Sequence, residues 1–194
     1  MVYSFCRFLS FLILKLFFHI EVKGRENIPT KGGFIVASNH VSFMDPIAVG
    51  VASPRALNYM ARHDLFCNPL FGWLIAHCNS FPVKRNSADF SALREAIRRV
   101  KSGGGLAIFP EGSRKANGAS LEPQAGIGFL ASKLNVPVVP AFVKGTEIAL
   151  PRGKNKLKAA KISVNFGEKI HIERGRSYQD ITATIMSSIK KLSD

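Results

Sequence analysis

The chain has few cysteines, few acidic residues, and no apolar run of the usual length for a membrane span. Its cysteines, Cys6, Cys67 and Cys78, are odd in number and form no C-x-x-C pair, which argues against a disulfide scaffold or a zinc site and favours reduced thiols. No internal repeat or low-complexity tract occurs. An apolar fraction of 46% over 194 residues instead predicts one compact domain with its own core.

Acidic residues number 13 against 27 lysines and arginines, so the formal net charge is +14. This imbalance indicates that something negative comes close: nucleic acid, an anionic membrane surface, an acidic carrier protein or a phosphorylated substrate. Nucleic acid is the least favoured partner, because the lysines are scattered, the aromatic residues lie mainly in apolar runs and no recognised binding motif occurs.

The N-terminal residues are the most apolar part of the chain, interrupted mainly by Arg7, Lys15 and His19. As a helix, residues 5–20 would rise roughly 24 Å, less than the ~30 Å of a bilayer's hydrocarbon core. We therefore expect residues 1–20 to be a membrane-associating segment that lies in or dips into one leaflet, with the three cations at the headgroups. A helix buried against the domain, and a true span, are the alternatives.

Residues 21–194 alternate between runs typical of strands and patterns typical of helices. This predicts a single α/β domain with a mixed, largely parallel sheet flanked by helices. Strands are expected at residues 20–22, 34–37, 57–61, 81–84, 106–109, 136–143 and 161–166. Helices are expected to start at Ser42-x-x-Asp45, with Pro46 inside the first turn, and to occur at 70–77, after a cap at Ser87, at 126–134 and at 178–192. Functional loops in such sheets follow strand ends, and two expected strands end in polar clusters.

The first cluster reads Asn39-His40-Val41-Ser42-Phe43-Met44-Asp45. A carboxylate at this distance from a histidine can hold one imidazole nitrogen and leave the other to accept a proton. A base with its orienting carboxylate, but without a nucleophilic serine or cysteine, suits a reaction in which the substrate's own hydroxyl attacks. On spacing alone, a structural His40 beside a capping Asp45 is the alternative.

The second cluster is Phe109-Pro110-Glu111-Gly112-Ser113-Arg114. Gly112 lets the backbone approach a ligand, Ser113 adds a donor, and Arg114 offers a two-pronged fork to phosphate. Glu111 can accept from a hydroxyl or hold Arg114 in place. Taken alone, a strand-to-loop turn with an ordinary ion pair is the alternative.

Together the two clusters resemble the paired signature of the glycerolipid acyltransferases, and most closely that of the bacterial-type 1-acyl-sn-glycerol-3-phosphate acyltransferases. Phe81-Pro82-Val83-Lys84-Arg85 is similar to the family's strand ending in a substrate-binding arginine, and Val136-Pro137-Val138-Val139-Pro140 to its fourth block. The similarity runs from about Val22 to Glu168. Arg62 stands where many relatives carry lysine, which preserves the charge but not the geometry.

The resemblance implies transfer of a fatty acyl group to the free hydroxyl of 1-acylglycerol 3-phosphate (lysophosphatidic acid), giving phosphatidic acid. It implies that His40 is the general base and that Asp45 orients it. The residues implied to hold the acceptor's phosphate and glycerol are Arg85, Glu111, Gly112, Ser113 and Arg114.

The resemblance also implies the partners and the location. The donor is an acyl thioester of acyl carrier protein or coenzyme A, and no metal, bound cofactor or nucleic acid is expected. An anionic membrane surface is the third partner, with the protein peripheral or monotopic at the cytoplasmic face of the cell membrane. Glycerol 3-phosphate, another lysophospholipid or a lyso-aminolipid is the alternative acceptor, and a lipid-binding protein that has lost catalysis is the alternative class.

Overall fold

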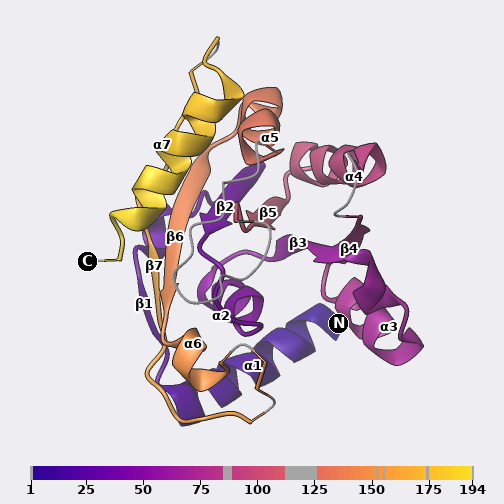
Figure 1. The fold of residues 1–194 in the computed structure, drawn as a ribbon, viewed down its shortest axis with the longest axis vertical. Helices are drawn as coiled ribbons and strands as arrows, with labels where there is room; N and C mark the ends of the chain where they lie inside the picture. The colour runs from indigo at the N-terminus through magenta and orange to yellow at the C-terminus, as the bar shows by residue number, and fades with distance from the viewer. Residues whose placement is uncertain are drawn as a thin grey trace.

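The structure is a computed structural model that describes residues 2–84, 89–111, 126–151, 153–154, 156–173 and 175–193. Within these residues one sheet of seven strands runs in the order β1-β7-β6-β2-β5-β3-β4 (Figure 1). The strands are β1 (Glu21–Lys23), β2 (Phe34–Ser38), β3 (Leu57–Arg62), β4 (Ser80–Val83), β5 (Gly105–Ile108), β6 (Val138–Lys144) and β7 (Ser163–Phe166).

Five neighbouring strands, β6, β2, β5, β3 and β4, are parallel to one another. β7 is antiparallel to β6, and β1 is parallel to β7. The predicted mixed, largely parallel α/β sheet is therefore confirmed. The segments that follow the five parallel strands leave the sheet at one edge, which is where such sheets place ligand sites.

Helices cover both faces of the sheet (Figure 1). α1 (Val2–Phe18) and α2 (Asp45–Ala52) pack on one face, and α4 (Phe90–Lys101), α5 (Gly126–Leu134) and α7 (Tyr178–Lys190) pack on the other. In β2, Phe34 and Val36 join the first core, whereas Ile35 and Ala37 join the second. Burial on both faces explains the uninterrupted apolar run that predicted this strand.

Helix starts follow local side-chain chemistry. Pro46 lies in the first turn of α2, and α3 (Pro69–His77) begins with a proline after Asn68, whose side chain accepts from the amide of Phe71. The predicted cap of α4 at Ser87 is wrong: the cap is Asp89, which accepts from two amides of the first turn, and Ser87 lies outside the described residues.

α1 packs on the domain along one side only. Its Leu14 and Phe18 are buried in the first core, and the amide of Ile162 donates to the carbonyl of Phe18 at 2.9 Å. Seven large apolar side chains of α1 remain exposed, namely Phe5, Phe8, Leu9, Phe11, Ile13, Leu16 and Phe17.

The three N-terminal cations, Arg7 and Lys15 in α1 and His19 just after it, lie in different environments. Lys15 and His19 are exposed. The expectation that Arg7 lies at headgroups is wrong, because its guanidinium turns inward and donates to the carbonyl of Ser53 at the end of α2. Among the described helices, none combines the length and apolarity needed to cross a membrane.

Candidate active site

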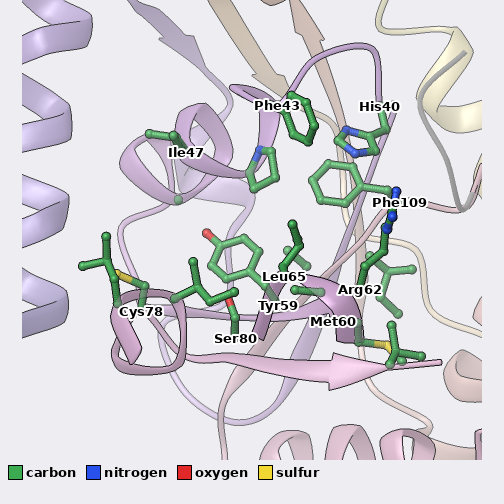
Figure 2. A pocket seen from close by; sticks show the side chains of 18 of the residues that line it. His40, Phe43, Ile47, Tyr59, Met60, Arg62, Leu65, Cys78, Ser80 and Phe109 are labelled. Atoms are coloured by element: carbon green, nitrogen blue, oxygen red, sulfur yellow. The ribbon is translucent and has the colours of Figure 1, made fainter. Parts of the chain in front are cut away.

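The two polar clusters meet because their strands are neighbours. β2 and β5 pair in parallel with Ala37 opposite Ile108, so the residues that follow each strand leave the sheet side by side. The imidazole of His40 lies over the ring of Phe109, with 4.4 Å between ring centroids and 30° between planes (Figure 2). Tertiary structure thus joins residues nearly seventy positions apart at one point of the sheet edge.

His40 is hydrogen-bonded to a fully buried carboxylate. Its Nδ1 lies 2.8 Å from Oδ2 of Asp45, which is 0% exposed. The same oxygen accepts the backbone amides of Val41 at 2.7 Å and Ser42 at 2.8 Å. Asp45 therefore both stabilises the turn before α2 and orients His40. The spacing left a capping role and an orienting role as alternatives, and the structure shows contacts for both. Because Asp45 is the acceptor, Nδ1 carries the hydrogen and Nε2 can take a proton.

A segment more than a hundred residues later holds this turn in place. The side-chain amide of Asn39 bonds both the carbonyl and the amide of Val143, at 2.8 and 2.7 Å. The hydroxyl of Ser42 donates to the carbonyl of Leu150 at 2.9 Å, and that of Thr146 donates to Oδ1 of Asp45. Sequence reasoning did not single out Thr146. Its signal was a Gly-Thr pair one residue beyond the expected strand 136–143, at the same sheet edge.

A cavity of about 1050 Å³ begins beside His40 and Phe109 and extends between α1, α2 and α3 (Figure 2). Its apolar lining includes Leu9, Ile13, Ile47, Val51, Leu65, Phe71 and Leu74. Burial raises the pKa of the Tyr59 hydroxyl within it. Burial, followed by contact with Cys6, raises the pKa of the Cys78 thiol to about 11. Both groups are therefore neutral near pH 7, and the interior suits an apolar ligand.

Comparison with known proteins identifies the family of this site. The family model described as "Acyltransferase" matches residues 19–144. The chain belongs to the acyltransferase family. A 1-acyl-sn-glycerol-3-phosphate acyltransferase of Bacillus subtilis is 32% identical over 171 residues, covering 88% of this chain and 83% of the relative. One of the same name from Streptococcus pneumoniae is 28% identical and covers 100% of this chain and 67% of the relative.

A solved structure gives the same result for the fold. The crystal structure of the 1-acyl-sn-glycerophosphate (LPA) acyltransferase PlsC of Thermotoga maritima superposes with a TM-score of 0.81 at 26% identity. The match covers 98% of this chain and 79% of that one. The family that the sequence motifs indicated is thus confirmed, and with it the prediction that the chain is an enzyme.

The acyltransferase brings together only part of the predicted acceptor site within the described residues. His40, Asp45 and Glu111 lie at one sheet edge, and Glu111, three residues beyond the end of β5, is buried at 6% exposure. The remaining predicted members lie outside the described residues: Arg85, Gly112, Ser113 and Arg114.

Three described cations line the cavity of the acyltransferase: Arg7, Arg62 and Lys84. Arg62 ends β3 and extends past Phe109 toward His40 (Figure 2), and Lys84 follows β4 directly. The carboxylate of Asp64 accepts from Nε of Arg62 at 2.9 Å and raises the pKa of that guanidinium. In the described part of the chain, no three His, Cys, Asp or Glu side chains form a group suited to a metal ion.

Proposed function

We propose that the chain transfers a fatty acyl group from a thioester of acyl carrier protein or coenzyme A to the free hydroxyl of 1-acylglycerol 3-phosphate, forming phosphatidic acid. The observation that carries this proposal is the His40–Asp45 pair at the wall of a large apolar cavity. Its volume of about 1050 Å³ lies at the upper end of the roughly 300–1,000 Å³ typical of ligand pockets, as a long acyl chain requires. The relatives' names supply the acceptor.

The reaction needs one base and no covalent intermediate. Nε2 of His40 takes the proton of the acceptor hydroxyl while the hydroxyl oxygen attacks the thioester carbonyl. Asp45 holds the ring and stabilises the imidazolium that forms. The carbon–sulfur bond then breaks, and the imidazolium returns its proton to the departing sulfur. The products are the new ester and a free thiol, and His40 ends neutral.

The acceptor's phosphate is placed on the polar side of the site. Arg85, Glu111, Gly112, Ser113 and Arg114 carry this role in the proposal, because Arg85 follows the cavity-lining Lys84 and the other four continue from β5 past Phe109. Arginine forks suit phosphate, and the glycine allows close backbone approach. The net charge of +14 favours encounter with an anionic acceptor in an anionic surface.

The protein meets its acceptor at the cytoplasmic face of the membrane, where α1 and α3 form the contact surface. α3 buries only Gly72 and exposes four large apolar side chains, Leu70, Phe71, Trp73 and Leu74. α1 exposes seven more, and both helices line the cavity. An exposed apolar surface around a cavity mouth indicates contact with an apolar partner, and the acceptor's own bilayer is such a partner.

The function is tested with purified protein, lysophosphatidate in vesicles, and acyl-CoA or acyl carrier protein as donor. We expect release of free thiol and formation of phosphatidate in equal amounts. The control acceptor is a monoacylglycerol with the same fatty acyl chain, which differs from lysophosphatidate only in lacking the phosphate. Because the site is built around that phosphate, the rate on monoacylglycerol should be lower by roughly 100-fold or more.

Each comparison in this assay has a result that would contradict part of the proposed function. If neither donor releases thiol in the presence of any acceptor on the panel, the chain does not catalyse acyl transfer. Equal rates on lysophosphatidate and monoacylglycerol would remove the phosphate role of Arg85 and Arg114. The ratio of rates with the two thioesters identifies the donor.

Membrane contact has a built-in reporter, since Trp73 is the only tryptophan and is 52% exposed. Added vesicles of phosphatidylglycerol and phosphatidylcholine should shift its emission to the blue, and the shift should weaken at high salt. The double variant Trp73→Phe/Tyr178→Trp moves the reporter to α7, where no shift is expected. Protein that sediments with vesicles while Trp73 emits as in water would refute contact through α3.

A further inference from the structure

The two oxygens of the Asp45 carboxylate have different partners. Oδ2 faces His40 and accepts two backbone amides. Oδ1 accepts the hydroxyl of Thr146 at 2.5 Å, a length found for hydroxyls bonded to carboxylates. Asp45 and Thr146 are both 0% exposed, so water is not at hand to replace either partner. The carboxylate is therefore fixed by amides on one side and by a single hydroxyl on the other.

Backbone geometry decides where that hydroxyl lies. Thr146 begins α6 (Thr146–Ala149), directly after Gly145, whose φ is +92°. A Cβ at Gly145 would lie 2.0 Å from the carbonyl oxygen of Lys161, so only glycine fits. The Asn39–Val143 and Ser42–Leu150 hydrogen bonds flank Thr146 on both sides. The hydroxyl thus stands on a rigid frame joined directly to the His40–Asp45 turn.

We propose that Thr146 is a positioning residue for acyl transfer, and that its hydroxyl keeps Oδ2 of Asp45 aimed at Nδ1 of His40. Without the hydroxyl, Oδ1 has no donor in a dry site, and the carboxylate can rotate so that Oδ1 shares the amides of Val41 and Ser42 and Oδ2 moves away from the ring. Thr146 does not line the cavity, so it acts through Asp45 and not on the substrate. The inference rests on the roles proposed above for His40 and Asp45.

The test compares Thr146→Val, which removes the hydroxyl at nearly constant volume, with Thr146→Ser, which keeps it. The valine variant should lose between about 10- and 100-fold in kcat, by analogy with the loss when a hydrogen-bond partner that orients a metal ligand is removed. KM for donor and acceptor should stay within about twofold, because ground-state binding is untouched. The serine variant should recover most of the lost kcat.

Thr182 provides the matched control. It is another buried threonine, on α7, and its hydroxyl donates to the carbonyl of Tyr178. Thr182→Val should lower the melting temperature and leave kcat unchanged. If Thr146→Val does not fold, Thr146→Ala takes its place. Its kcat should then lie well below that of Thr146→Ser, and equal values would contradict the proposal.

A second readout does not depend on the reaction. In protein with labelled histidine, the Nδ1 proton of His40 should give a low-field NMR signal, identified by its loss in His40→Ala. This signal should persist in Thr146→Ser and broaden or vanish in Thr146→Val. If it does so while His40→Ala keeps the wild-type rate, the proposed function fails and the positioning contact stands.

Three results would overturn the positioning role. The first is a valine variant with wild-type kcat and an unchanged His40 signal. The second is a serine variant as slow as the valine variant, which would assign the effect to packing of the buried methyl group. The third is a loss confined to KM, which would assign Thr146 to substrate binding.

Discussion

His40→Ala is expected to lower kcat for phosphatidate formation by about 10²–10⁴-fold, the usual contribution of a positioned general base. Stability should fall by only about 1–2 kcal/mol: the largely buried ring loses its packing on Phe109, but Asp45 keeps both backbone amides and Thr146 as donors. The measurements are thiol release under saturating substrates and thermal unfolding of the same preparations.

The exposed His171 gives the matched control for this variant. His171→Ala makes the same chemical change far along the chain, so its rate should equal that of the wild type. An unchanged rate for His40→Ala would end the assignment of the base. A loss of rate accompanied by an equally large loss of folded protein would show that His40 is a structural residue.

Asp45→Ala is expected to lower both the rate and the free energy of unfolding. The change leaves the amides of Val41 and Ser42 and the hydroxyl of Thr146 without their acceptor. Because Asp45 is buried and each buried donor left without an acceptor costs about 1–3 kcal/mol, the loss should be at least about 3 kcal/mol. Urea unfolding at fixed temperature measures it, and kcat should fall by no more than in His40→Ala, because the base remains in place.

Asp180→Ala separates this effect from the general cost of losing a carboxylate. Asp180 is an exposed residue at the start of α7, bonded to the hydroxyl of Ser177. Its removal should cost less than about 1 kcal/mol and leave the rate unchanged. If Asp45→Ala is no less stable than Asp180→Ala, the buried carboxylate does not organise the turn as its contacts indicate.

Sequence patterns predicted most of the fold because each strand and helix carries its own local signal. The uninterrupted run in β2 reflects burial on both faces, and Pro46 and Pro69 mark true helix starts. The His40–Asp45 contact could be predicted from the sequence for the same reason, because the two residues are only five positions apart.

Contacts between segments far apart in the sequence could not be predicted from such local patterns. The Asn39–Val143 hydrogen bonds form because β6 lies next to β2 in the sheet. The order of strands in a sheet cannot be predicted from the hydrophobic periodicity of each strand. Arg7 was misplaced because its acceptor, the carbonyl of Ser53, comes from the end of another helix. The cavity likewise depends on how α1 and α3 pack against β3 and β4, which a linear sequence does not show.

The hydrogen bonds from Val143, Thr146 and Leu150 to the turn after β2 also determine when the catalytic pair can assemble during synthesis of the chain. The ribosome releases α1 before the segments that complete the site, so the apolar face of α1 emerges while much of the domain is still unmade. The His40–Asp45 pair reaches its final geometry only after the chain has been translated past Leu150. For the proposed membrane contact, this order means that α1 can meet a bilayer before the catalytic pair is assembled.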